Sequence, residues 1–239
     1  MTESNSCLGE EFDTVFELIK NDLFSLRYEW RIYTSLFGTN PERVELLNEV
    51  SAQVAGTIDR HLFEGCIIAI CRLTDPEEFL RSGSKNISVK HLVRFMKTDK
   101  QKEHISDLIN DCISKASFAR SWRNKKIAHS DLDVRKKAKL METASRFKVS
   151  EAIDAIARII RWIGEEFFES DIRTHPISPF SSDEVKFLKY LYDGRNHAQE
   201  KEIKHMELVK SGKHSEAHAL YTQYPDWVTF RPDDFPEEK

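Results

Sequence analysis

Hydrophobic side chains recur every three or four positions along residues 12–37, and this spacing predicts a long amphipathic helix. Gly38 ends the pattern. Asn40 and Pro41 then have the residue types that are typical of an N-cap and of a first helical position. The second helix is expected to continue to about Thr74, where an Asp-Pro pair follows. Two long helices with a short connection predict an antiparallel helix hairpin.

Two further helices are predicted after this hairpin. Residues 87–97 form the shorter one, which Ser88 is expected to cap. Residues 98–128 form the longer one, in which Thr98 and Gln101 have the spacing of a capping box. The apolar positions of the longer helix share one face and are expected to be buried: Ile105, Leu108, Ile109, Cys112, Ala116 and Ala119.

A last bundle helix is predicted after the charged residues 130–148, which have no clear period and are expected to form a loop. Ser150 is expected to cap this helix, which covers residues 151–168. Its apolar positions again share one face: Ile153, Ile156, Ala157, Ile160, Ile163 and Phe167. These elements predict an all-α fold, a helical bundle that is built on the long antiparallel helix hairpin and covers residues 1–173.

Residues 174–239 are predicted to form a helical C-terminal extension. Prolines and small hydroxyl residues indicate a linker at residues 174–181, and helices are expected from there to about Tyr221. The tail that follows is rich in proline, aromatic and acidic residues and is expected to be irregular. Trp227 and Phe230 of this tail are expected to pack on a neighbouring surface. No segment has the pattern of a strand.

The composition is that of a folded helical protein. Of the 239 residues, 40% are hydrophobic and 32% are charged, and glycine and proline are few. The four cysteines form no Cys-x-x-Cys pair, so neither a disulfide framework nor a zinc knuckle is predicted. The first residues lack a signal-peptide pattern, and no window approaches about 18 uninterrupted apolar residues. We therefore expect a cytoplasmic protein without a membrane segment.

The net charge of −4 gives no overall attraction to nucleic acid, but the local charge differs. Residues 115–139 contain nine basic side chains and two acidic ones. Such a run is usually a solvated helix face. This one contains the sequence RNKKIAH, from Arg123 to His129, which places a titratable imidazole among cations.

Arg123 and His129 together carry the chemistry that RNA cleavage needs. A histidine takes and returns a proton near neutral pH, and a guanidinium holds two phosphate oxygens through parallel hydrogen bonds. RNA supplies its own nucleophile, the 2′-hydroxyl, so no metal is required. On an ideal helix the two side chains point about 120° apart, so they do not share a face. The alternative is a helix C-terminus at which cations stabilise the helix dipole.

Three segments upstream of RNKKIAH form, together with it, a characteristic order of sequence motifs. They read WRIYTSLFG, AICRLTDP and KNISVKHLV, at residues 30–38, 69–76 and 85–93. HEPN proteins typically carry an arginine, a polar residue and then a histidine after a short gap. The four segments together resemble the HEPN superfamily, and specifically its AbiU-like abortive-infection branch, over residues 12–168.

The resemblance implies a metal-independent endoribonuclease that uses no cofactor. It also implies a homodimer, in which two copies of the motif meet in a cleft at the subunit interface. Arg123 would stabilise the phosphate and the transition state, and His129 would serve as acid and base. Asn124 would orient the histidine or the phosphate. The other basic residues of the segment are expected to bind or steer RNA: Arg120, Lys125 and Lys126.

Three charged residues have two interpretations each. Arg72 and Asp75 belong to the AbiU-like pattern, and the favoured interpretation is an ion pair between them at a helix stop. Alternatively, they brace Arg123 from behind. Asp131 could hydrogen-bond to His129 and fix its tautomer, but an aspartate after a helix end is also an ordinary turn residue.

Two other pairs of side chains could bind a metal ion or RNA, but each pair has a simpler structural explanation. His214 and His218 have a spacing that can bind zinc on a helix, but the glutamate between them is misplaced for a zinc-protease motif. Exposed histidines are therefore favoured, and no metal site is predicted. Trp122 and Trp162 could stack on RNA bases, but their helical spacing favours core or dimer contacts.

The first hypothesis is a ribonuclease of a phage-defence or toxin–antitoxin system. It would cut RNA to a 2′,3′-cyclic phosphate and a 5′-hydroxyl end. The expected partners are RNA, a second copy of the chain, and a cognate antitoxin or regulatory protein. The alternative is a non-catalytic HEPN-type interaction module that binds a nucleotide or another protein.

Overall fold

The computed structural model describes residues 7–76, 86–127, 143–175, 183–220 and 224–229. The α-helices follow one another as α1 Glu10–Tyr33, α2 Pro41–Thr74, α3 Asp99–Lys115, α4 Ser117–Trp122, α6 Arg146–Phe168, α7 Asp183–Lys210, α8 His214–Ala219 and α9 Asp226–Thr229. Shorter helical pieces are the π-helical turns Thr34–Gly38 and Arg123–Ile127 and the 3₁₀ helix Val89–Phe95. The described ranges contain no strand, so the predicted all-α class is confirmed.

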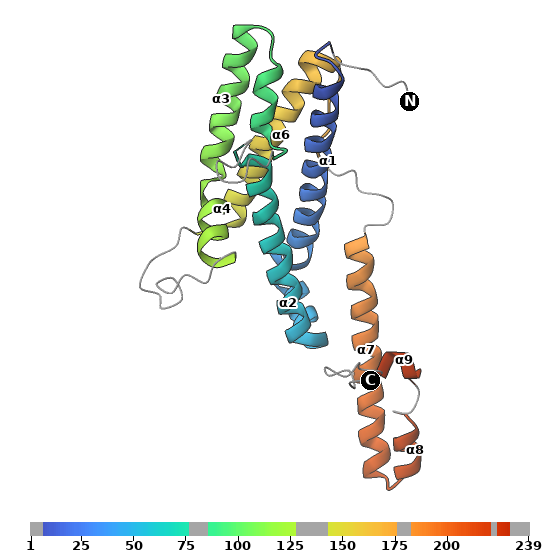
Figure 1. Cartoon of the computed structure of the whole chain (residues 1–239). Helices are drawn as coiled ribbons and strands as arrows, with labels where there is room; N and C mark the ends of the chain where they lie inside the picture. The colour runs from blue at the N-terminus through green and yellow to red at the C-terminus, as the bar shows by residue number, and fades with distance from the viewer. Residues whose placement is uncertain (1–6, 77–85, 128–142, 176–182, 221–223, 230–239) are drawn as a thin grey trace, which may run out of the picture. The chain divides into compact units, whose positions relative to one another are not determined.

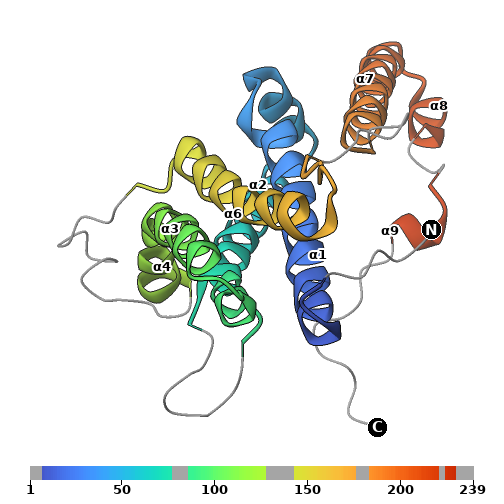
Figure 2. The ribbon, with the colours of Figure 1, turned by 90° about the horizontal axis from the view of Figure 1, so that it is seen from above.

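The chain divides into two compact units, Met1–Val185 and Lys186–Lys239. In the first unit, α1, α2, α3 and α6 form a bundle in which consecutive helices run in opposite directions (Figure 1). Seen from above, α6 lies between α3 and α1 (Figure 2). The antiparallel hairpin of α1 and α2 is the predicted one. The domain boundary that the sequence predicts between residues 173 and 174 stays a prediction.

The start of α2 has the predicted cap. Asn40 Oδ1 accepts a hydrogen bond from the backbone N–H of Glu42 at 2.8 Å, and Pro41 takes the first helical position. The helix ends at Thr74, as expected. Inside it, however, Ser51 has an extended backbone with φ −167° and ψ 95°, so the helix is broken there. The sequence pattern did not predict this break.

The core of the first unit contains the predicted apolar faces of α1, α3 and α6, together with buried side chains of α2. Leu108 and Phe167, which belong to these faces, are only half-buried. The buried members include Phe12, Phe16, Ile19, Leu23 and Leu26 of α1, Cys66, Ile67, Ile70 and Cys71 of α2, Ile105, Ile109 and Cys112 of α3, and Ile153, Ile156, Ile160 and Ile163 of α6. Hydrophobic periodicity therefore identified the buried faces of α1, α3 and α6.

The helix predicted over residues 98–128 is interrupted. Its capping box is confirmed, because the Thr98 side chain accepts from Gln101 N at 3.2 Å and the Gln101 side chain accepts from Thr98 N at the same distance. At Ala116 the backbone leaves the helical conformation, with φ −87° and ψ 0°. The Arg120 side chain donates to the Ile113 carbonyl at 3.2 Å, which stabilises the chain at this break.

Two predicted capping hydrogen bonds do not form. Residues 89–95 form a 3₁₀ helix in which the Ser88 hydroxyl makes no capping hydrogen bond. α6 begins five residues earlier than predicted, because Ser145 caps it by accepting from Lys148 N at 3.3 Å. Ser150 instead lies within α6, where its hydroxyl accepts from the Trp30 indole N–H at 3.0 Å. The Ser150 side chain, which the local pattern predicted as a cap, thus makes a tertiary contact with Trp30 instead.

The second unit contains most of α7, together with α8 and α9. Gly212 has φ +75° and ends α7, while Lys213 N donates back to Leu208 O at 2.9 Å. Trp227 of α9 is 80% exposed, so the predicted packing of this side chain is wrong. Phe230 lies outside the described residues.

The buried cysteines predict how stability depends on pH. Burial raises the pKa of the Cys66 and Cys112 thiols to about 12 and that of Cys71 to about 11, from an ordinary value of 9.0. The unfolded chain therefore loses these protons at lower pH than the folded chain. Their contribution to stability is complete below about pH 9 and is lost as the pH rises from about 9 to about 12.

Denaturant titrations at about pH 8 and about pH 10.5 test this dependence. We expect the free energy of unfolding to be lower at the higher pH, and we expect Cys112→Ala to show a smaller pH-dependent decrease than wild type. An equal decrease in both proteins would contradict the assignment to the buried thiols.

Candidate functional site

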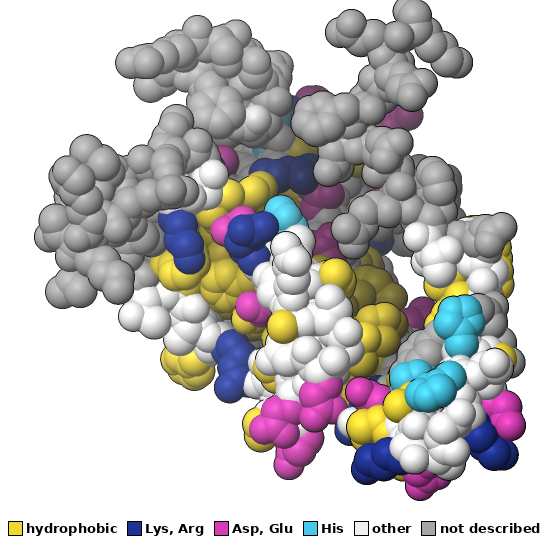
Figure 3. Space-filling model, turned by 90° about the horizontal axis from the view of Figure 1, so that it is seen from below, with side chains coloured by type: hydrophobic (Ala, Val, Ile, Leu, Met, Phe, Trp, Pro, Cys, Tyr) yellow, Lys and Arg dark blue, Asp and Glu magenta, His cyan; other side chains and the backbone are white. Residues whose placement is uncertain are grey.

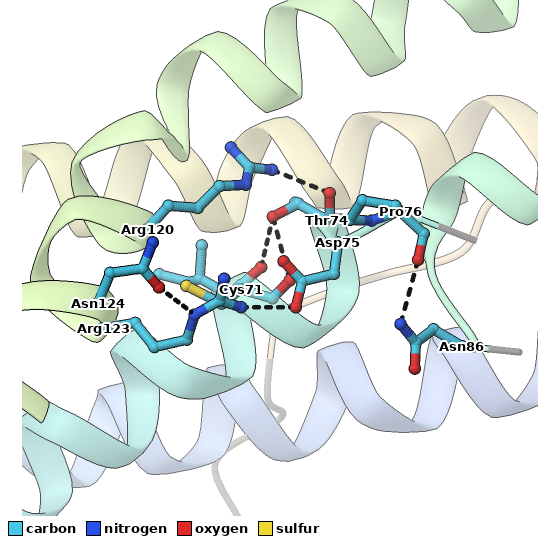
Figure 4. A network of polar contacts seen from close by, with 9 residues as sticks. Cys71, Thr74, Asp75, Pro76, Asn86, Arg120, Arg123 and Asn124 are labelled. Atoms are coloured by element: carbon cyan, nitrogen blue, oxygen red, sulfur yellow. Dashed lines mark hydrogen bonds and ion pairs between the residues drawn. The ribbon is translucent and has the colours of Figure 1, made fainter. Parts of the chain in front are cut away.

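Arg123 is the first residue of a π-helical turn that follows α4. Such turns are rare and occur frequently at functional sites, because the wider turn changes the direction of the side chains. Figure 4 shows Arg123 with the side chains around it, which come from the end of α2, from α4 and from the turn itself. From this turn the Arg123 side chain reaches the end of α2 (Figure 4).

Asp75 is the nearest charged partner of Arg123. Arg123 Nη1 donates to Asp75 Oδ2 at 2.6 Å (Figure 4). Asp75 is the C-cap of α2 and is buried, whereas the Arg123 side chain is 27% exposed. Charge-assisted hydrogen bonds of this kind are roughly twice as strong as neutral ones. The carboxylate thus holds a guanidinium that still reaches the surface.

Asn124 holds the same guanidinium from a second direction. Its Oδ1 accepts from Arg123 Nε at 3.1 Å. Arg123 is therefore fixed through both Nε and Nη1, and other N–H groups of the guanidinium remain for an incoming anion.

Arg72 does not take part in this arrangement. Its guanidinium is largely exposed and lies 4.0 Å from Asp22 of α1. The ion pair between Arg72 and Asp75 that the sequence favoured is thus not formed in the described part of the chain. The helix stop at Asp75 is confirmed, and the alternative contact between Asp75 and Arg123 is the one that forms.

Arg120 connects the elements that carry the site. Its Nη2 donates to the backbone carbonyl of Thr74 at 2.9 Å, in addition to the Nη1 contact with Ile113. Thr74 is the last residue of α2, so its carbonyl has no partner within that helix. Arg120 therefore fixes the end of α2 against α4, next to Asp75. The predicted RNA contact of Arg120 stays a prediction.

The remaining predicted residues are placed as follows. Lys126 Nζ lies over the Trp122 ring, 4.2 Å from its centroid. Lys125 is half-exposed on the same turn. Trp122 and Trp162 are both partly buried against the core, so the packing that the sequence favoured is confirmed. His129 and Asp131 lie outside the described residues, and their roles stay predictions.

One comparison with known proteins gives a match. The sequence model of AbiU2, a HEPN family, matches residues 9–188, which is more than half of the chain. The chain belongs to the AbiU2 family of HEPN proteins. The resemblance seen in the sequence is thereby confirmed, and the family indicates an abortive-infection-like, HEPN-type function. No curated protein and no solved structure matches the chain.

The AbiU2 match contains all four bundle helices, the end of α2 and the complete motif from Arg123 to His129. Within the described residues of this family member, no group of three or more His, Cys, Asp or Glu side chains could hold a metal ion. His214 and His218 of α8 lie outside the matched range. Among the helices of the described ranges, none has both the length and the hydrophobicity to cross a membrane.

Sequence reasoning did not favour the contact between Asp75 and Arg123, and it did not predict the open pocket beside Trp122 of this AbiU2 chain. It treated Asp75 as an ion-pair partner of Arg72, although the position of Asp75 just before Pro76, at a helix end, was a signal that its side chain could point to another element. The pocket depends on Tyr33 and on residues far away in the sequence.

Proposed function

We propose that this AbiU2-family chain is a metal-independent endoribonuclease of a phage-defence or toxin–antitoxin system. The observation that carries the proposal is the fixed position of Arg123, which Asp75 and Asn124 hold at the surface within an intact arginine–histidine motif. Family membership supports it, because HEPN proteins of this pattern are often ribonucleases.

The proposed reaction needs no group from outside the RNA and the protein. The 2′-oxygen attacks the adjacent phosphorus and loses its proton to a base. The bond from phosphorus to the 5′-oxygen breaks, and that oxygen takes up a proton. The products are a 2′,3′-cyclic phosphate and a 5′-hydroxyl. His129 is the proposed acid and base, and Arg123 stabilises the negative charge that grows on the phosphate oxygens.

The contact between Asp75 and Arg123 supports this role by orientation. A long arginine side chain loses conformational freedom when it binds a phosphate, and a guanidinium that is already held loses less. The carboxylate partly offsets the positive charge, but it leaves N–H groups of Arg123 available. Asp75 is thus a positioning residue for the proposed reaction.

A homodimer is part of the proposal, because a two-fold axis would bring two copies of the motif to one RNA strand. Lys125 and Lys126 would add positive charge that steers the RNA to the site. A cognate antitoxin or another regulatory protein would restrain the activity.

Cleavage of mixed RNA in the presence of excess chelator tests the proposed function. We expect wild type to cut the RNA and to leave cyclic phosphate ends. Intact RNA at high protein concentration would favour the alternative, an interaction module without catalysis.

The variant Asp75→Asn tests the positioning role. The amide has nearly the shape of the carboxylate but no charge, so it holds Arg123 less firmly. We expect kcat for RNA cleavage to fall about tenfold while KM changes little, because a hydrogen bond to a charged group is weakened. Steady-state kinetics on a defined RNA oligonucleotide measure both constants.

Asp22→Asn is the matched control, because Asp22 is partnered with the exposed Arg72 and lies outside the proposed site. It should keep the wild-type kcat. If Asp75→Asn also keeps the wild-type kcat while its melting temperature falls, Asp75 serves only the stability of the bundle.

A further inference from the structure

An open pocket of about 260 Å³ lies at the surface of the bundle beside the turn that carries Arg123. Its walls come from the end of α1, the middle of α2, the end of α4 with the following turn, and the start of α6. We call it the α2–α4 pocket and define it by Tyr33, Asp59, Phe63, Glu64, Trp122 and Arg146. On the face of the chain in Figure 3, basic side chains lie at the border of a hydrophobic area.

Three aromatic rings form one wall of the α2–α4 pocket. The Phe63 ring centroid lies 5.4 Å from that of Tyr33 and 5.4 Å from that of Trp122. Aromatic walls bind flat, partly polar rings well, and nucleobases gain about 1–3 kcal/mol per base from such contacts in other proteins. This wall alone would fit many flat ligands, so the polar groups of the pocket decide its specificity.

Two carboxylates lie among these rings. Burial raises the pKa of the Tyr33 phenol, and the nearby Asp59 carboxylate raises it further. Asp59 and Glu64 both line the pocket. Ionised carboxylates only accept hydrogen bonds. They therefore fit a ring that presents N–H donors.

Three cations complete the α2–α4 pocket: Arg60, Lys126 and Arg146. Lys126 is held over the Trp122 ring, and the Arg60 and Arg146 residues are exposed. In one pocket, the cations fit the phosphate of a nucleotide and the aromatic rings fit the face of its base. The carboxylate acceptors fit a base edge that is rich in N–H donors. Guanine presents two adjacent N–H donors on one edge, which match the two oxygens of a carboxylate.

The α2–α4 pocket is separate from the Arg123 guanidinium. Phe63 and Asp75 are twelve residues apart on an unbroken part of α2, which corresponds to about 18 Å along the helix axis. Trp122 and Arg123 are neighbours in the chain, but their side chains reach these two distant points of α2. A base in the pocket is therefore not the base at the bond that Arg123 would act on.

We propose that the α2–α4 pocket binds a guanine base of the RNA, more than one nucleotide away from the bond that is cut. This inference rests on the proposed ribonuclease function, because it makes the pocket a determinant of where the RNA is cleaved. A guanine held here places a defined phosphate, more than one nucleotide further along the RNA, at Arg123.

Calorimetric titration of the full chain with the four nucleoside 5′-monophosphates tests the pocket without cleavage. We expect guanosine monophosphate to bind at least about tenfold more tightly than the other three nucleotides, because a lost hydrogen bond to a charged group has an effect of this size. Glu64→Gln and Asp59→Asn should each weaken binding of the guanosine nucleotide and reduce this preference. Glu45→Gln, an exposed acid on the same helix outside the pocket, is the matched control and should bind as wild type does.

Arg123→Ala separates this inference from the proposed function. The pocket does not include Arg123, so this variant should still bind guanosine monophosphate with the wild-type preference. Preferential binding by a wild-type chain that cuts no RNA would support the pocket and contradict the ribonuclease.

Sequencing of the cleaved ends gives a second readout, in which a guanine is expected at a fixed distance from the cut in wild type but not in Glu64→Gln. Equal binding of all four nucleotides would overturn the inference even if RNA is cut. If none of the four nucleotides binds, the inference is also overturned. The remaining candidate ligand of the pocket is then a protein segment.

Discussion

Arg123→Ala is expected to lower the rate of RNA cleavage by a factor of about 10³, the upper range for loss of one donor that stabilises a transition-state charge. The reason is that negative charge grows on the phosphate oxygens as the 2′-oxygen attacks, and a fixed guanidinium donates charge-assisted hydrogen bonds to those oxygens. Single-turnover cleavage of a labelled RNA with excess protein measures the chemical step directly.

Arg72→Ala is the matched control for this prediction. Arg72, like Arg123, is an arginine near Asp75 in the fold, but it belongs to the last turn of α2, is exposed and lies 4.0 Å from Asp22. Its loss should change the rate by less than about twofold, because exposed ion pairs contribute little. Equal losses in the two variants, or an unchanged rate in Arg123→Ala with an intact helical spectrum, would contradict the role of Arg123.

His129→Ala is expected to lower the cleavage rate by a factor of about 10² to 10⁴, the range for loss of a general acid or base. The wild-type rate should depend on pH with an ionisation near the usual histidine value of about 6.5. The residual rate of the variant should lack this ionisation. Rates measured across this pH range test the assignment.

An exposed histidine of α2, His61, provides the control for this variant. His61→Ala should keep both the rate and its pH dependence. If His129→Ala retains the wild-type pH profile, another residue transfers the proton and the assignment of His129 fails.

The sequence predicted the bundle because its information is local and periodic. Apolar positions at steps of three and four identified the buried faces of α1, α3 and α6, and the caps at Asn40 and Thr98 gave two helix starts. These features depend only on residues within a few positions of one another. The family resemblance in the same segments was also confirmed.

The sequence did not predict where helices change their geometry. The break at Ala116 and the π-helical turn at Arg123 leave the apolar period almost unchanged, so the hydrophobic pattern gave one continuous helix. The Arg120 side chain stabilises the break through a carbonyl, and a contact of this kind leaves no periodic signal. Ser145 and Ser150 were equally good cap residues, and a contact with Trp30 decided between them.

The least predictable part of the site is the contact between Asp75 and Arg123. These residues are 48 positions apart. Each has an oppositely charged residue much closer in the sequence, Arg72 for Asp75 and Asp131 for Arg123. Only the packing of α4 against α2 brings them together. The walls of the α2–α4 pocket come from four separate segments and were hidden for the same reason.

The most direct test of the central claim uses an RNA oligonucleotide that carries a single 2′-deoxyribose at the nucleotide where wild type cuts. In excess chelator, we expect the all-ribose oligonucleotide to be cut to a 2′,3′-cyclic phosphate and the substituted one to stay intact at that position, because its nucleophile is missing. Cleavage at the substituted position, or cleavage that requires an added divalent metal, would contradict the account.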